Sequence, residues 1–196
     1  MKRAGWKLVA GLSHESYHFA TLHRDSVAAF LHANAVVDFF GQHSRWAFPM
    51  KGIGKLNDKL ESDWPATVEG VINHTIFPGT VVITNPEDAQ IIRVEPGNHP
   101  GHSIVYYSGV CRRAGNIEAA HSAYGFGGKV FETADLPAAA ECQQGLSITR
   151  QPMVIGKNEP VVQFWHRLWR QALGHRVVYF LANAGSLLYA AVTVCV

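Results

Sequence analysis

Two overlapping histidine patterns lie between residues 14 and 23, and they predict different metal chemistry. His14 and His18 enclose Glu15 in an H-E-x-x-H pattern, in which two imidazoles one helical turn apart bind zinc and the glutamate acts as general base. His18 and His23 lie five residues apart, so they can face one ion only if a helix loosens near Thr21. With a distant carboxylate they would form the two-histidine, one-carboxylate site typical of non-haem Fe(II). The first pattern predicts a zinc peptidase and the second an oxygenase.

The peptidase pattern is short, and its extended form fails. The sequence holds 11 histidines, so a five-residue match arises easily by chance. Thr21 and Arg24 occupy the positions where the extended zinc pattern has its glycine and third histidine. We interpret His14 and His32 as ordinary polar or capping residues. The oxygenase pattern is therefore the better supported of the two.

Composition narrows the class of protein. The 196 residues suffice for one domain with a buried core, and 47% hydrophobic against 16% charged residues place the chain outside the disordered class. The net charge of +2, without runs of like charge, argues against a nucleic-acid partner. Cys111, Cys142 and Cys195 form no C-x-x-C pair, so the sequence predicts neither a disulfide framework nor a zinc knuckle. This cysteine usage favours a cytoplasmic location.

The C-terminal end differs from the rest of the chain. Residues 177–196 carry no charge and have about the length of a membrane span. Asn183, Gly185 and Ser186 interrupt this run at its middle, so we favour a buried strand pair or a foreign tail over a membrane anchor. We expect a domain over 1–175 and a separate apolar tail over 176–196.

The elements that must position the histidines follow the order helix, sheet, helix. Apolar periodicity predicts helices over 6–24 and 24–38, and helical texture resumes after the glycine-rich 125–128, at 136–146 and 159–173. The predicted strands are 43–48, 74–77, 80–84, 90–94 and 103–111. Helices segregated from an antiparallel sheet predict an α+β fold with a ligand pocket between the two layers.

Several segments together resemble one enzyme family. Trp6-Lys7-Leu8-Val9, followed by Glu15-Ser16-Tyr17-His18-Phe19 and His23, resembles the catalytic-domain signature of Rieske-type aromatic ring-hydroxylating oxygenase α subunits, which runs N-W-K, E-S-Y-H, H. The similarity covers about 5–170, and its further segments are 38–45, 73–79, 131–137, 143–146, 156–159 and 165–166. Each segment is weak alone, but their order along the chain is specific.

The resemblance implies a helix-grip fold and an iron site. It assigns His18, His23 and Asp135 as ligands of Fe(II), and it gives Glu15 the place of the carboxylate that links the iron to the electron donor of a neighbouring subunit. The residues alone leave another role open for Asp135, because it precedes Leu136-Pro137 and would suit a helix N-cap.

The resemblance also implies substrates and partners. The substrates would be O2 and an aromatic or similarly hydrophobic molecule, with electrons arriving from a reductase or ferredoxin into a homo-oligomer, trimeric in the family. An apolar pocket would hold the organic substrate. Plain core packing remains open for its candidate lining residues, which are Leu12, Phe19, Phe40, Phe126 and Phe131.

The sequence also departs from the family. The family's [2Fe–2S] cluster requires two cysteines and two histidines, and this sequence contains no C-x-H or C-x-x-H pattern for them. Gly5 replaces the usual asparagine before Trp6, and Gly11-Leu12 replaces a usual Asn-Phe. We therefore expect an N-terminally truncated α subunit with little turnover alone. The alternative is a metal-free helix-grip domain that binds a hydrophobic ligand.

Overall fold

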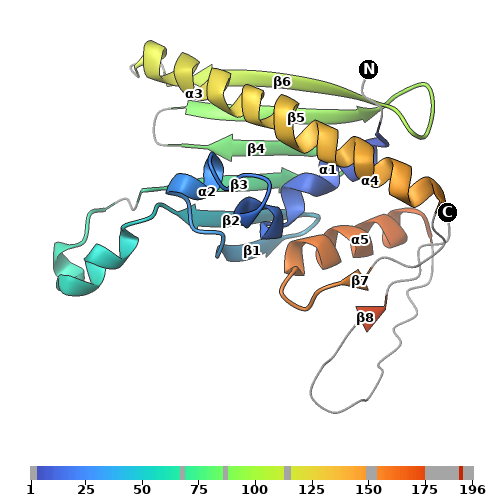
Figure 1. Ribbon diagram of the computed structural model, residues 1–196. Helices are drawn as coiled ribbons and strands as arrows, with labels where there is room; N and C mark the ends of the chain where they lie inside the picture. The colour runs from blue at the N-terminus through green and yellow to red at the C-terminus, as the bar shows by residue number, and fades with distance from the viewer. Residues whose placement is uncertain are drawn as a thin grey trace.

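A computed structural model describes residues 4–66, 69–85, 88–112, 116–148 and 154–174, and the backbone of 190–191. Its centre is a six-stranded antiparallel sheet in which each strand pairs with the next along the chain (Figure 1). The strands are β1 Val36–Phe40, β2 His43–Pro49, β3 Gly70–Ile76, β4 Thr80–Thr84, β5 Asp88–Pro96 and β6 Ser103–Cys111. This meander confirms the predicted α+β fold class and all five predicted strands.

The first strand was not expected from the periodicity. The predicted helix over 24–38 is wrong: only α2, Val27–Phe30, is helical there, and β1 begins at Val36. The β-branched and aromatic residues of β1 suit a half-buried strand, and Gly41 adopts the left-handed φ of 57° that the two-residue turn into β2 requires.

The predicted helix over 6–24 is broken into short pieces. α1 spans Trp6–Gly11, followed by the 3-10 turns η1, Leu12–His14, and η2, Tyr17–Ala20. Glu15 between them is extended, with φ −140° and ψ 163°. Its carboxylate accepts hydrogen bonds from the backbone N–H groups of Tyr17 and His18, at 2.7 and 3.2 Å, and so satisfies the donors that open the next turn.

The longest helical segment runs without interruption from α3, Ile117–Val130, through the π-helical turn η5, Phe131–Asp135, into α4, Leu136–Ile148. The glycine-rich segment over 125–128 therefore lies inside a helix and does not precede one. Pro137 lacks a backbone N–H and cannot complete an α-helical hydrogen bond, which accounts for the wide turn immediately before it. Asp135 lies within this helix, so the N-cap interpretation of Asp135 is wrong.

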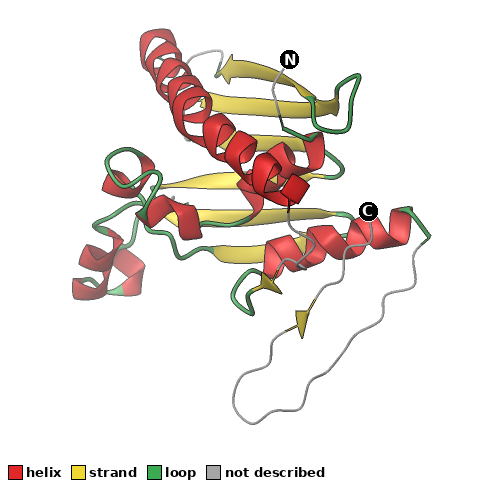
Figure 2. Cartoon of the chain, turned by 45° about the vertical axis from the view of Figure 1, so that its right-hand side comes forward, coloured by secondary structure: helices red, strands yellow, loops and turns green. Residues whose placement is uncertain are grey.

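The helices that cover the sheet lie over one of its faces, and among the described residues no helix lies over the other face (Figure 2). Between sheet and helices the core has two parts. One joins α1, η5, α4 and α5, Pro160–Ala172, to β4 and β5; the other joins β2 to Leu31 and Val161. The 3-10 turns η3, Ile53–Asp58, and η4, Glu61–Asp63, occupy the long connection between β2 and β3. α5 confirms the predicted last helix.

The predicted tail over 176–196 lies outside the described residues except for a short strand. β8, Ala190–Ala191, pairs with β7, Val154–Ile155. Among the helices that the structure describes, none is long and apolar enough to cross a bilayer. The domain boundary at 175 and the nature of the tail stay predictions.

Candidate metal centre

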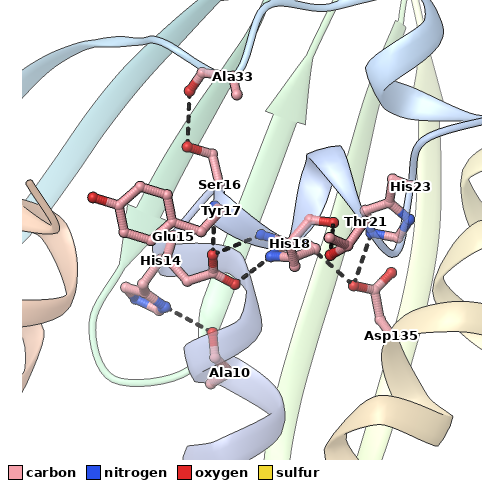
Figure 3. A network of polar contacts seen from close by, with 10 residues as sticks. All are labelled: Ala10, His14, Glu15, Ser16, Tyr17, His18, Thr21, His23, Ala33 and Asp135. Atoms are coloured by element: carbon pink, nitrogen blue, oxygen red, sulfur yellow. Dashed lines mark hydrogen bonds and ion pairs between the residues drawn. The ribbon is translucent and has the colours of Figure 1, made fainter. Parts of the chain in front are cut away.

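Three of the predicted site residues meet at one point. One ligand atom of each of His18, His23 and Asp135 lies within 4.8 Å of the other two (Figure 3). The Nε2 atoms of His18 and His23 lie 3.7 and 3.2 Å from Asp135 Oδ1. Ligand atoms at right angles around a first-row ion, each at about 2.1 Å, would be about 3.0 Å apart. The spacing of the three groups thus fits a single ion of that size.

The chain between the two histidines turns instead of continuing as a helix. η2 ends at Ala20, and the backbone N–H groups of Thr21, Leu22 and His23 all donate to the carbonyl of His18. This compact turn brings the two imidazole rings to a centroid distance of 4.9 Å. The loosening near Thr21 that the five-residue spacing demands is therefore present.

The third group arrives from the other end of the sequence. Asp135 is the last residue of the π-helical turn and is buried, 112 residues after His23. π-helical turns inside α-helices are frequent at functional sites, because the extra residue re-aims the side chains of the turn. The carboxylate supplies the negative charge that a divalent ion requires beside two neutral imidazoles.

Glu15 fixes the orientation of His18. Its Oε1 contacts His18 Nδ1, which leaves Nε2 of the same ring directed at Asp135. Hydrogen bonds of this kind from a carboxylate set the tautomer and raise the basicity of a metal-binding imidazole. Burial alone would raise the pKa of Glu15, but the hydrogen bonds from His18 and Tyr17 outweigh it and lower that pKa below its ordinary value.

His14 belongs to a different environment. Its Nδ1 lies 2.7 Å from the carbonyl oxygen of Ala10, and its ring packs against Trp165 at 4.9 Å. Burial lowers the pKa of His14 to about 4. Because Glu15 is extended, His14 and His18 are not on one helix face, and His14 points away from His18 in Figure 3. Among the described residues, the only group arranged to hold a metal is His18, His23 and Asp135, so the zinc-peptidase geometry is not formed.

Of the residues predicted to line the pocket, only some lie near the three candidate ligands. Phe19 lies at the site, with ring centroids 5.2 Å from His18 and 5.9 Å from His23. Leu12 and Phe131 pack into the core, and Phe131 lies one helical turn before Asp135. Phe126 is 44% exposed and contacts Phe30 of α2.

Phe40 is a wrong prediction for the pocket. It pairs with His43 across the β1–β2 turn and is 51% exposed. Asp38, two residues before Phe40 on β1, is half-buried, and its partner on β2, Arg45, is exposed. The alternate residues of β2, Ser44, Trp46 and Phe48, are buried under the helices. Since side chains two apart share a face, Phe40 lies on the sheet face opposite the helices.

One residue beside the site was missed by the sequence reasoning. Phe48 of β2 is 1% exposed and packs against Phe19 with ring centroids 5.4 Å apart. Its signal in the sequence is the alternation of Ser44, Trp46 and Phe48 on the buried face of β2. Phe19 and Phe48 together form an aromatic wall next to the two histidines.

Comparison with known proteins identifies the protein family and solved structures of similar fold. The family described as ring hydroxylating alpha subunit (catalytic domain) matches residues 2–175. Among solved structures, the chain is similar to the quaternary ammonium Rieske monooxygenase CntA. The crystal structures with an inhibitor and with L-carnitine both give a TM-score of 0.64, at 15% and 13% identity, and the structure with γ-butyrobetaine gives 0.59 at 14%.

The structural similarities cover most of this chain but less than half of the CntA chain. Each covers 87% of this chain but only 45–46% of the CntA chain, so this chain spans less than half of that protein. Comparison with curated proteins gave no significant match. The structural likeness supports the fold, while the family match extends over most of the sequence. The chain belongs to the catalytic-domain family of ring-hydroxylating oxygenase α subunits.

Proposed function

We propose that this chain is the iron-binding part of an oxygenase that inserts oxygen from O2 into a hydrophobic organic substrate. His18, His23 and Asp135 would hold Fe(II). The observation that carries the proposal is the convergence of two imidazoles and one buried carboxylate from segments 112 residues apart. This donor set suits ferrous iron and leaves other coordination positions open. Bound iron would supply the redox-active centre at which dioxygen reacts.

The surrounding residues have separate tasks in this proposal. Glu15 holds the Nδ1 side of His18 so that Nε2 stays free to bind the metal. Phe19 and Phe48 exclude water from one side of the site and offer apolar surface to the substrate. Asp135 sits on a helix whose core contacts hold it in place, so the ligand set needs little rearrangement when metal arrives.

Glu15 also points to where electrons would enter. Its carboxylate contacts His18 on one side and accepts a hydrogen bond from the backbone of Tyr17, whose side chain is 58% exposed, on the other. We assign this place to the docking of an electron donor from a neighbouring subunit in a homo-oligomer, trimeric as in the family. The 196 residues contain no C-x-H or C-x-x-H pattern, so the [2Fe–2S] cluster would come from outside this sequence. Turnover by this chain alone should therefore be very low without a reductase or ferredoxin and such a cluster.

The substrate class has two candidates. An aromatic or comparably hydrophobic molecule suits the Phe19–Phe48 wall. A quaternary ammonium compound is the second candidate, because the structural neighbours bind L-carnitine and γ-butyrobetaine and because aromatic faces attract cations. Titration of the metal-loaded protein with naphthalene-type and betaine-type ligands, followed by changes in the metal's absorption spectrum, would distinguish the two.

Anaerobic Fe(II) titration tests the metal site. The wild type should bind one Fe(II) per chain, and His23→Ala should lower the affinity by more than about 100-fold, because the loss of a ligand costs more than the loss of a residue that only supports one. His32→Ala, which removes an exposed histidine, is the control and should bind like the wild type. Unchanged stoichiometry and affinity in His23→Ala would contradict the proposal.

Ligand binding after chelation, together with oxygen uptake, distinguishes the oxygenase from the metal-free alternative. A hydrophobic-ligand binder that does not use metal should retain its ligand after complete chelation and show no metal-dependent oxygen uptake. An oxygenase should consume O2 only when Fe(II), a reductant and a cluster-bearing partner are supplied. Ligand binding that is equal with and without Fe(II), together with no oxygen uptake, would favour the binder.

A further inference from the structure

Helix α3 is fastened to the sheet by polar contacts that run in both directions. From the sheet, Gln90 Nε2 of β5 donates to the carbonyl oxygen of Ala123 at 3.2 Å, and the Tyr107 hydroxyl of β6 donates to Gln90 Oε1. From the helix, the Tyr124 hydroxyl donates to the carbonyl oxygen of Tyr107 at 3.2 Å. We call Gln90, Tyr107 and Tyr124 the clasp. Figure 1 shows α3 lying across β5 and β6 at this place.

Two glycines make this close approach possible. A Cβ on Gly127 of α3 would lie 2.5 Å from the Tyr107 hydroxyl oxygen and closer still to Gln90 Oε1. A Cβ on Gly109 of β6 would lie 2.9 Å from the Tyr124 ring. Both distances are shorter than any that real Cβ atoms tolerate without movement. Gly125, two residues before Gly127, faces open space and has no such requirement.

The clasp is rigidly connected to the candidate metal centre. Gly127 and Asp135 belong to one uninterrupted helical segment and are eight residues apart, about 12 Å along the axis. Tyr107 also stacks on Phe131, with ring centroids 6.4 Å apart and planes at 27°, one turn before Asp135. The 3.2 Å contact between Asp135 and His23 therefore depends on how far the helix stands from the sheet.

We propose that the clasp positions Asp135 for metal binding, with Gly127 setting the height of the helix over the sheet. The proposal rests on the metal site proposed above and adds residues to it. None of the clasp residues is among the metal ligands, so they are positioning residues. An added methyl group at residue 127 would meet the ends of the Gln90 and Tyr107 side chains. Because these ends hydrogen-bond to each other and, through Gln90, to the Ala123 carbonyl of the helix, the helix must move outward unless the clasp itself opens. Metal sites lose affinity when a ligand is displaced by about 1 Å.

The test compares two glycine variants of the same helix in Co(II) titrations of the full chain. Gly127→Ala should weaken Co(II) binding by about 10- to 100-fold, the range typical of residues that support a ligand. It should also change the visible absorption spectrum at saturating Co(II). Gly125→Ala is the matched control, because alanine favours helix and meets no neighbour there, and it should change neither quantity. A role in stability alone would lower the unfolding temperature without altering the spectrum of the saturated protein.

A variant that lacks the two clashing side-chain oxygens tests whether the clash causes the loss of Co(II) affinity. The double variant Gln90→Ala/Tyr107→Phe removes both oxygen atoms that the new Cβ would meet. Adding Gly127→Ala to it should weaken Co(II) binding by less than about twofold further, since the clash is gone. A full additional loss in this background would mean that the clash is not the cause, and would overturn the proposal.

Asp135→Ala distinguishes a failure of the proposed metal site from a failure of the clasp proposal. If it leaves Co(II) binding unchanged, the metal site itself is refuted, and the clasp proposal with it. If Asp135→Ala weakens binding while folded Gly127→Ala keeps the wild-type affinity and spectrum, only the clasp proposal is overturned. Should Gly127→Ala fail to fold, Tyr107→Phe decides: it removes one clasp hydrogen bond, is expected to weaken Co(II) binding several-fold, and unchanged affinity and spectrum would refute the clasp.

Discussion

At the scale of single residues, two histidines of one short motif have opposite surroundings. His18 has a carboxylate on each side, Glu15 at Nδ1 and Asp135 near Nε2. His14, four residues earlier, is buried against Trp165 and the Ala10 carbonyl, and its Nε2 has no hydrogen-bond partner among the described residues. Carboxylates favour a metal-binding imidazole, whereas burial without a charge partner favours a permanently neutral one. Their partners, and not their spacing, therefore determine what the two histidines do.

The buried, neutral state of His14 predicts a pH dependence of stability. Its pKa falls from 6.5 in the unfolded chain to about 4 in the folded one, so between these values the unfolded chain binds more protons. The free energy of unfolding therefore falls as the pH drops from 6.5 towards 4. The loss due to His14 amounts to as much as about 3 kcal/mol, and it is absent above pH 6.5. Urea unfolding of His14→Asn from pH 7 to pH 4 should show a correspondingly shallower decline than the wild type.

Exposed His32 provides the comparison for this prediction. His32→Asn should retain the wild-type dependence of unfolding free energy on pH. A decline of equal steepness in His14→Asn and the wild type would show that His14 does not contribute to it.

At the scale of elements, the continuous helical segment formed by α3, η5 and α4 determines where the candidate ligand Asp135 lies. Its regular part contacts the sheet through the clasp, and its π-helical turn presents Asp135. Pro137 explains why regular α-helical hydrogen bonding fails at that place. One helix thus combines a fixed anchor with a locally irregular turn at the candidate ligand.

The start of this helix depends on a side-chain cap. Asn116 Oδ1 accepts a hydrogen bond of 3.0 Å from the backbone N–H of Ala119. Asn116→Ala should lower the free energy of unfolding by about 1 kcal/mol, because that donor loses its partner. Asn116→Asp should keep wild-type stability within about 0.5 kcal/mol, since aspartate caps equally well. Urea denaturation distinguishes these outcomes, and equal stabilities for the alanine and aspartate variants would refute the capping role.

At the scale of the whole molecule, the helices in the described part of the chain cover only one face of the sheet (Figure 2). Side chains on the covered face of β2 are buried, and those of the other face are exposed or half-buried. This layering decides which aromatic residues support the fold and the site. It also explains why an aromatic residue beside a family-like segment, Phe40, does not line the pocket.

Phe48 and Phe40 provide a matched pair for this layering. Phe48 is 1% exposed and packs against Phe19 and Trp46, whereas Phe40 is 51% exposed beside Arg45. Phe48→Ala should lower the free energy of unfolding by about 3–5 kcal/mol, and Phe40→Ala by less than about 1 kcal/mol. Thermal or urea unfolding of the two variants measures the difference. Similar losses for both would contradict the assignment of the two faces.

Much of the fold was accessible from local sequence signals. Alternating apolar runs between turn residues predicted β2 to β6, because both strand propensity and turn chemistry are local. Glu15 and the histidines were accessible through their spacing and the family resemblance. Helix boundaries were less accessible from the sequence. Gly125, Gly127 and Gly128 have low helix propensity, yet all three lie within α3, where Gly127 and Gly128 lie against Tyr107 of the sheet.

The sequence by itself determined the fold class, five of the six strands of the central sheet, and the two histidines as a candidate metal-binding pair. Only the tertiary structure decided that Asp135 joins them, that His14 does not, and that Phe40 faces the opposite side of the sheet. The physical reason is distance along the chain. Propensity and periodicity act over a few residues, whereas the meeting of groups 112 positions apart depends on how a long helix packs against the sheet.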